Sequence, residues 1–423
     1  MSEKSTPEAF GVRLAEPYFT GSKWVSPLNF FEEVRQRMTI PKKVIIHDVT
    51  LRDGEQTPRV AFRPEEKLFI AEEMDKIGIP SIEPGLPVIE EDKQVIKTLV
   101  QMDLSARITP LARLQKEDVE FLIDAKVDGM VLEFGINPYL IKYVYNLTPD
   151  ELINRIIEYS NKAKQETGMY IEFMGWDTFR IPDLSYIKNF FSRILEKGSI
   201  DRITVSDTFG MAHPLAMQFM IQKLREWFPS IPLGLHIHND FGLATANALM
   251  AVVSGVDEVH CSVNGLGERA GNAPTEEVAM ALEYLLNIDT GINLKGLNRL
   301  SEIVAEVSKV RPATNKPIVG SRLFEVESGI VIHIMQELEE KGFKVAHMLP
   351  YDPQSVGRSP VQFIPGKGSG HHYVEGLLKE LKASASQEQI REIVKQIKVT
   401  ASVLKNALPR DLAESIVWEV LKG

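Results

Sequence analysis

The feature that most constrains the fold is a regular alternation of short β-rich runs with amphipathic segments of ten to twenty residues, which begins near residue 44. Eight such β/α units over about 270 residues are typical of a (β/α)8 TIM barrel. An open, doubly wound α/β sheet has the same alternation, so the pattern alone leaves both architectures open. The strands are predicted at residues 44–49, 81–83, 106–109, 129–134, 169–174, 202–205, 233–237 and 258–263.

Two further segments flank the alternation. Residues 1–40 contain prolines among scattered aromatic residues, a composition that predicts an arm packed on the body or on a partner subunit. After residue 318 the alternation has stopped and the chain is mostly helical, with no evident core of its own. We therefore expect an N-terminal arm (1–40), a barrel (41–318) and a helical C-terminal subdomain (319–423), with the two end segments packing on a neighbouring subunit.

Composition excludes several classes of protein. The net charge of −10 argues against a nucleic-acid-binding surface and against polybasic contact with a membrane. The single cysteine, Cys261, excludes an intramolecular disulfide and is expected to be a small buried residue. No apolar run reaches the roughly 20 residues needed to span a bilayer. The first seven residues carry no hydrophobic signal core, so a cytoplasmic location is expected.

Two histidines and an aspartate, far apart in the chain, are candidate metal ligands. His236 and His238 follow an apolar run, and alternate side chains of a strand project to the same face, so the two can share one cation. Asp53 ends the first unit and Asn272 ends the eighth. In a closed barrel these ends are neighbours, which predicts a mixed nitrogen–oxygen site for a divalent metal. This argument also favours the barrel over the open sheet, because only closure brings the residues together.

Three other residues are candidates for binding a substrate or for supporting the metal site. Arg52 precedes Asp53, and a guanidinium beside a metal can hold an oxyanion that develops during a reaction. Glu83, at the end of the second strand, is predicted to orient Arg52 or a ligand, although a solvated loop acid is the alternative. Thr208, at the end of the sixth strand, is a candidate for binding a substrate carboxylate.

Three motifs carry a resemblance to a known family. Residues 50–56 (TLRDGEQ), 236–240 (HIHND) and 265–272 (GLGERAGN) resemble the signatures of the DRE-TIM metallolyase superfamily. The chain is most similar to its 2-isopropylmalate, homocitrate and citramalate synthases. The resemblance implies a cytoplasmic homodimer that uses a divalent metal (Mg²⁺, Mn²⁺ or Zn²⁺). It also implies a Claisen-type condensation of acetyl-CoA, or another acyl-CoA, with a 2-oxo acid.

The resemblance also implies roles for individual residues. Asp53, His236 and His238 would be metal ligands, with Asn272 a ligand or near neighbour. Arg52 would stabilise an enolate or alkoxide, and Thr208 would hold the 2-oxo acid. Two alternatives remain: a lyase that cleaves a carbon–carbon bond of a hydroxyacyl-CoA on the same metal site, and a non-catalytic relative that binds a metabolite. The cysteine-bearing glycine loop of hydroxymethylglutaryl-CoA lyase is replaced here by residues 267–270 (GERA), which favours a synthase.

The chain departs from the family pattern around the metal site. Trp176 stands where the synthases have a catalytic glutamate, and the tail histidine is displaced by two positions to His333. The candidate proton acceptors are therefore Asp177, His333 and Glu327. Arg59 replaces a glycine and, if it points inward, would bind a second substrate carboxylate; a solvent-facing Arg59 is the alternative. We accordingly expect a substrate other than 3-methyl-2-oxobutanoate.

Overall fold

The computed structural model describes residues 8–422, which divide into two compact units. One unit is formed by residues 27–312, and the other combines the described residues up to Ser26 with the chain from Ala313. The boundary thus falls after Pro312 rather than after residue 318, and the predicted arm (1–40) is divided between the units. The first seven residues of that arm lie outside the described residues.

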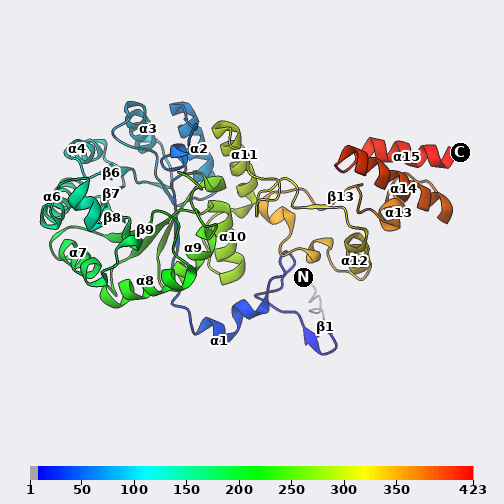
Figure 1. Cartoon of the computed structure of the whole chain (residues 1–423), viewed down its shortest axis with the longest axis horizontal. Coiled ribbons are helices and arrows are strands. Elements are labelled where there is room, and N and C mark those ends of the chain that lie inside the picture. The colour runs from blue at the N-terminus through cyan, green and yellow to red at the C-terminus, as the bar shows by residue number, and fades with distance from the viewer. Residues whose placement is uncertain (1–7, 423) are drawn as a thin grey trace. The chain divides into compact units, whose positions relative to one another are not determined.

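Parallel strands in the 27–312 unit form one sheet that curls into a barrel (Figure 1), in the order β5-β4-β3-β11-β10-β9-β8-β7-β6. The two ends of this order, β5 and β6, are separated only by Thr109 and Pro110, so they are the halves of one bent strand. Proline lacks the N–H that a sheet ladder needs, which explains the break. The TIM-barrel-like fold predicted from the alternation is therefore confirmed, with its third strand divided. The strands are β3 (Ile45–Asp48), β4 (Ser81–Ile82), β5 (Arg107–Ile108), β6 (Leu111–Arg113), β7 (Gly129–Gly135), β8 (Tyr170–Trp176), β9 (Arg202–Asp207), β10 (Leu233–Ile237) and β11 (Glu258–Cys261).

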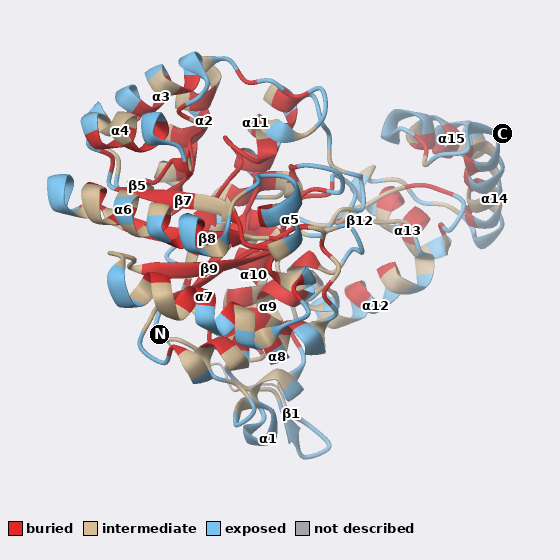
Figure 2. Cartoon of the chain, turned by 60° about the vertical axis from the view of Figure 1, so that its left-hand side comes forward, coloured by how far each residue is buried: buried red, intermediate tan, exposed pale blue. Residues whose placement is uncertain are grey.

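Helices cover the outside of the barrel with their apolar faces buried (Figure 2). In α7, for example, Asp183 caps the first turn by accepting hydrogen bonds from two backbone N–H groups, and Ile187, Phe190 and Ile194 are buried at helical spacing. The helices are α1 (Glu32–Arg35), α2 (Pro64–Lys76), α3 (Glu90–Gln101), α4 (Lys116–Ala125), α5 (Pro138–Tyr143), α6 (Pro149–Thr167), α7 (Leu184–Lys197), α8 (Pro214–Trp227), α9 (Ala244–Val253), α10 (Thr275–Leu286) and α11 (Leu297–Ser308).

The register of the strands decides which side chains share a layer of the barrel interior. His236 of β10 pairs with Ser206 of β9 and with His260 of β11, which in turn pairs with His47 of β3. Residues aligned in neighbouring parallel strands project to the same face. A band of polar residues therefore fills one level of the barrel, below the loops that follow the strands.

The second unit has a hydrophobic core, so the prediction of a tail without a core of its own was wrong. Buried residues of four helices form this core, including Ile332, Val374, Ile393, Ile397 and Val417. Residues 8–26 of the arm belong to this unit, for example through a hydrogen bond from the Trp24 N–H to the Pro350 carbonyl (3.1 Å). The unit contains β1 (Glu8–Ala9), β2 (Val12–Arg13), β12 (Glu325–Val326), α12 (Gly329–Glu340), β13 (Gln362–Phe363), α13 (His371–Glu380), α14 (Gln387–Leu404) and α15 (Arg410–Lys422).

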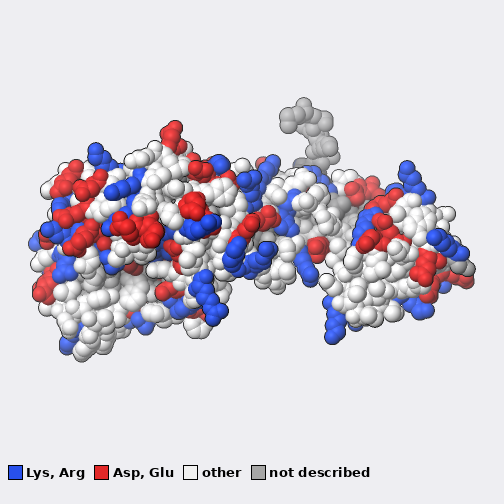
Figure 3. All heavy atoms as spheres, turned by 90° about the horizontal axis from the view of Figure 1, so that it is seen from above, with Lys and Arg blue, Asp and Glu red and all other residues white. Residues whose placement is uncertain are grey.

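The surface carries charges of both signs. On the face drawn in Figure 3, Lys and Arg are interspersed with Asp and Glu rather than gathered into one basic field. Among residues 8–422, no helix combines the length and apolar character needed to cross a bilayer.

Candidate metal centre and active site

The three ligand candidates converge at the carboxyl ends of the barrel strands. Asp53 lies in the turn after β3, while His236 and His238 lie within and just after β10. The Nε2 atoms of the two histidines are 3.2 Å apart, and they lie 3.4 and 3.9 Å from Asp53 Oδ2. Two ligands bound about 2.1 Å from one ion at tetrahedral or octahedral angles are about 3.0–3.4 Å apart. The separations of 3.2 and 3.4 Å fit a single cation between these side chains, and the third, 3.9 Å, exceeds this range by about 0.5 Å.

The charge states and unpaired atoms of these residues also suit a cation. Burial lowers the pKa of His236 to about 3 and lowers the pKa of His238, so both imidazoles are neutral and keep a lone pair. Burial alone would raise the pKa of Asp53, but Arg52 and His236 outweigh it and hold that pKa below its ordinary value. Within the described chain, Asp53 Oδ1 and Asn272 Oδ1 are buried without a hydrogen-bond partner. Unpaired buried oxygens cost free energy unless they bind something, so the donor set fits a divalent cation.

The loop after β11 brings Asn272 to the ligands. Asn272 forms a backbone bridge with His238, and its Nδ2 donates a hydrogen bond to the Leu266 carbonyl (2.9 Å). Gly267 lies between Asn272 and Asp53: a Cβ there would be 2.3 Å from Asn272 Nδ2 and 2.9 Å from Asp53 Oδ1. Its φ of +146° is also one that side-chain-bearing residues rarely adopt. Glycine is thus required for the close approach of these two oxygen-bearing side chains.

Arg52 is held beside the ligands by two carboxylates. Its Nη1 donates to Asp53 Oδ2 (2.9 Å) and its Nε donates to Glu83 Oε1. Burial by itself would lower the pKa of Arg52, but attraction to Glu83 and Asp53 outweighs it and raises that pKa. Arg52 Nη2 is buried without a partner in the described part of the chain, which leaves one donor of a fixed guanidinium available. Glu83 is fully buried and orients Arg52.

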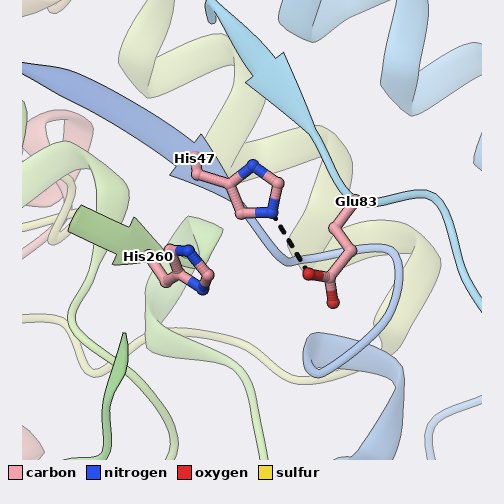
Figure 4. A group of neighbouring side chains, drawn as sticks. All are labelled: His47, Glu83 and His260. Carbon is pink, nitrogen blue, oxygen red and sulfur yellow. Dashed lines mark hydrogen bonds and ion pairs between the residues drawn. The ribbon is translucent and has the colours of Figure 1, made fainter. Parts of the chain in front are cut away.

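Glu83 also belongs to a second polar cluster, with His47 and His260 (Figure 4), and the sequence analysis singled out neither of these histidines. His47 Nε2 is 3.1 Å from Glu83 Oε2, and the ring of His260 lies 4.5 Å from the ring of His47 and 5.5 Å from that of His236. Burial would lower the pKa of His260, but Glu172, whose Oε1 is 3.0 Å from His260 Nε2, outweighs it and raises that pKa to about 9. His260 is therefore an imidazolium paired with a buried carboxylate. Polar residues at alternate positions of the predicted strand 258–263 could have indicated His260 from the sequence.

A cavity of about 200 Å³ opens onto the ligands. A second cavity, of about 290 Å³, has Arg113, Glu133 and Trp176 in common with the first. Glu133 also escaped the sequence analysis, because a single acid within an apolar strand carries no pattern. Besides Arg52 and the three ligand candidates, the first cavity is lined by Gln56, Leu86, Leu111, Arg113, Glu133, Trp176 and Glu268.

Asp177 and Thr208 lie in loops next to the cavities but line neither of them. The buried carboxylate of Asp177 accepts hydrogen bonds from Arg180 Nε (2.6 Å) and Nη2 (2.7 Å) and from Asn137 Nδ2 (2.8 Å). Thr208 Oγ1 accepts a hydrogen bond from the Asp177 N–H (2.9 Å) and lies 3.0 Å from Ser206 Oγ. The geometry therefore does not support Asp177 as a free proton acceptor, because its oxygens are already engaged.

Arg59 and His333 are not brought to the ligands by the described barrel. Arg59 is exposed, at a turn with φ +74°, and lines neither cavity, which agrees with the solvent-facing alternative. His333 is exposed on α12 of the other unit, where its ring stacks on that of His372 at 4.1 Å. Arg59 lies in a tight turn that directs its side chain outward. His333 belongs to the other unit, so the barrel by itself does not bring it to the ligands.

Comparison with known proteins gives the family. The family model described as HMGL-like matches residues 43–304, more than half of the chain. A 2-isopropylmalate synthase of Methanocaldococcus jannaschii is 37% identical over 91% of this chain and 73% of the relative. The homocitrate synthase AksA of Methanopyrus kandleri is 37% identical over 93% of this chain and 96% of the relative. The crystal structure of hydroxymethylglutaryl-CoA lyase from Pseudomonas aeruginosa has the same fold, with a TM-score of 0.57 and 20% identity over 63% of this chain and 94% of the lyase. This chain therefore belongs to the HMGL-like family.

Proposed function

We propose that this protein is an acyltransferase that condenses an acyl-CoA, in the first place acetyl-CoA, with a 2-oxo acid to give a 2-hydroxy diacid and free CoA. The observation that carries the proposal is the convergence of Asp53, His236 and His238 beside Arg52 at one end of the barrel. The relatives that match most of the chain at 37% identity are named as 2-isopropylmalate and homocitrate synthases.

We propose that Asp53, His236 and His238 hold a divalent cation, with Asn272 Oδ1 as a further ligand or near neighbour. When bound, the cation would polarise the carbonyl group of the 2-oxo acid as a Lewis acid. The unpaired buried oxygens and neutral imidazoles support this assignment. The donor set suits Zn²⁺, Mn²⁺ or Mg²⁺, because it mixes imidazole nitrogen with carboxylate and amide oxygen.

Arg52 has the position of an oxyanion-binding residue. Its guanidinium lines the cavity, stays charged at every working pH, and has one buried donor without a partner. During condensation the negative charge moves from the enolate oxygen of the thioester to the oxygen of the former keto group. A fixed donor aimed at that region stabilises the developing charge without reorganisation. Glu83 orients this guanidinium from below.

A lyase that cleaves a hydroxyacyl-CoA is the second candidate. Only the fold similarity to hydroxymethylglutaryl-CoA lyase supports it, at 20% identity. The 37% identity to synthases covers 91–93% of the chain and outweighs that support.

We further propose a homodimer. Exposed apolar residues on the tail helices support it: Val399 and Val403 are 58% and 77% exposed and lie four residues apart on α14, and Trp418 on α15 is 42% exposed.

Release of CoA tests the proposed reaction. The metal-free protein is reloaded with Zn²⁺, Mn²⁺ or Mg²⁺ and incubated with acetyl-CoA and, in turn, 3-methyl-2-oxobutanoate, pyruvate, oxaloacetate and 2-oxoglutarate. We expect CoA release that needs both a metal and a 2-oxo acid, with a substrate other than 3-methyl-2-oxobutanoate preferred because the indole of Trp176 lines the cavity. Cleavage of a hydroxyacyl-CoA without any condensation would contradict the proposal.

A further inference from the structure

The two cavities near the metal centre meet at a wall made by Arg113 of β6, Glu133 of β7 and Trp176 of β8. Strand register explains this, since Arg113 is aligned with Glu133 and Gly135 is aligned with Trp176. Aligned residues of neighbouring parallel strands project to the same face, so Glu133 and Trp176 both face the barrel interior. The inner cavity contains the ligand candidates, and the outer one does not.

The outer cavity has an aromatic wall. A Cβ added to Gly135 would lie 3.0 Å from Trp176 Cε3 and 3.5 Å from Tyr145 Cε2, so both rings lie against the backbone of β7 at this position. The Phe134 and Tyr145 rings are also adjacent, with centroids 4.6 Å apart. A surface of this kind suits a small apolar group such as the acyl end of a thioester.

Glu133 differs from the other acids of the inner cavity in the partners of its carboxyl group. Within the described residues it makes no hydrogen bond or ion pair, and it is partly buried. Asp53 is a ligand candidate bonded to Arg52, and Glu268 is exposed and 3.4 Å from Arg269 Nη1.

The neighbourhood of Glu133 suits proton transfer near neutral pH. Burial raises the pKa of Glu133 to about 7. The positive charge of Arg52 lowers this pKa. The negative charges of Glu83, Asp53 and Glu268 raise it further. Arg113, beside it, is engaged by Asp118 through hydrogen bonds from Nε (2.8 Å) and Nη2 (3.0 Å). The Tyr145 phenol is the remaining titratable group that interacts with it, and burial raises the pKa of that phenol.

We propose that the outer cavity binds the acyl thioester and that Glu133, in the wall between the cavities, is the catalytic base that removes the proton from its α-carbon. This inference rests on the proposed function. The carboxylate takes the proton and the C–H electron pair forms the enolate. The enolate carbon then bonds to the keto carbon of the 2-oxo acid, whose π electrons move to oxygen. That oxygen is protonated afterwards, and hydrolysis of the thioester releases CoA.

Glu133→Gln tests the base, because the amide has the same shape and cannot accept the proton. We expect kcat to fall by about 10²–10⁴-fold, the usual contribution of a general base, while metal content and the KM for the 2-oxo acid stay within threefold. Exchange of the thioester α-hydrogens with deuterated water, measured with the metal-loaded enzyme and an unreactive 2-oxo acid analogue, should be lost in the same proportion. In the wild type we expect kcat to rise with pH near neutrality, as Glu133 loses its proton. The residual activity of Glu133→Gln should show no such rise.

Glu268→Gln is the matched comparison, since it removes an acid from the same cavity at an exposed position. It should lower kcat by less than tenfold. A larger loss in Glu268→Gln than in Glu133→Gln, or a Glu133→Gln enzyme within tenfold of the wild type with an unchanged pH profile, would overturn the assignment of the base.

Gln115→Trp tests the outer cavity, because Gln115 is exposed and lines only that cavity. An indole at this rim should raise the KM for acyl-CoA at least tenfold and leave the KM for the 2-oxo acid unchanged. An unchanged KM for acyl-CoA would overturn the binding site. A wild-type enzyme that releases no CoA with any 2-oxo acid would instead contradict the proposed function, which keeps the two failures distinct.

Discussion

Replacing Gly267 by alanine should damage the proposed metal centre without unfolding the protein. The new Cβ would lie 2.3 Å from Asn272 Nδ2 and 2.9 Å from Asp53 Oδ1. Ordinary contacts of a Cβ begin near 3.4 Å, so the Asn272 amide must retreat by about 1 Å. Metal sites tolerate ligand displacements of only about 0.2 Å. Asn272 or Asp53 is therefore expected to leave its position.

The expected loss of metal affinity follows from the proposed role of Asn272 and Asp53. Disturbing groups that orient metal ligands typically costs about 10–100-fold in affinity, which corresponds to about 1.4–2.8 kcal/mol. The variant also carries the backbone cost of alanine at φ +146°, of the order of 1–3 kcal/mol in folding stability. Both effects are large enough to measure separately.

Gly242→Ala is the matched control. Gly242 also has a positive φ, +71°, and follows the histidine ligands in the chain, but a Cβ there would meet nothing within 4 Å. It should lose stability through backbone strain alone and keep its metal affinity.

Calorimetric titration of the metal-free proteins with Zn²⁺ or Mn²⁺ gives the affinity, and thermal unfolding of the same samples gives Tm. We expect Gly267→Ala to bind metal at least tenfold more weakly than Gly242→Ala. Equal affinities in the two variants would refute the argument that Gly267 makes room for the metal ligands.

Three further predictions concern charged residues and assembly. Arg52→Lys should keep the bound metal but lose about 10²–10³-fold in kcat, because lysine keeps the charge and lacks the planar fork; near-normal kcat would mean that Arg52 only supports the structure. The pKa of His260 is raised to about 9 from its ordinary value of 6.5, so its pairing with Glu172 stabilises the fold below about pH 6.5, and this stabilisation is lost as the pH rises through 9. The Tm of the metal-free protein should accordingly fall over this range, and His260→Gln should weaken the fall; identical pH profiles of Tm would contradict the ion pair. Sedimentation at micromolar concentration should give a dimer, and an active monomer would exclude the proposed assembly.

Much of the barrel could be predicted from local pattern. The strand at 233–237 matches the predicted segment, because a run of apolar residues is a property of neighbouring residues. The pair His236 and His238 could be predicted from strand alternation, which is equally local. The sequence did not predict that the third strand continues beyond Pro110. Proline is a local signal for a break, but only the pairing of both halves with their neighbours shows that they belong to one strand.

What the sequence by itself determined is the order of β/α units, the candidate metal-ligand motifs and the family resemblance. Tertiary structure alone decided which charged residues share a cavity: Glu133 lies on β7 and Arg52 lies in the turn after β3, and their meeting depends on register and closure. It likewise decided that Asp177 accepts a hydrogen bond from Asn137, 40 residues away in the chain, and that Arg59 is exposed. The physical reason is that a residue's type limits its chemistry, whereas its charge state and partners depend on burial and on residues that are distant in the chain.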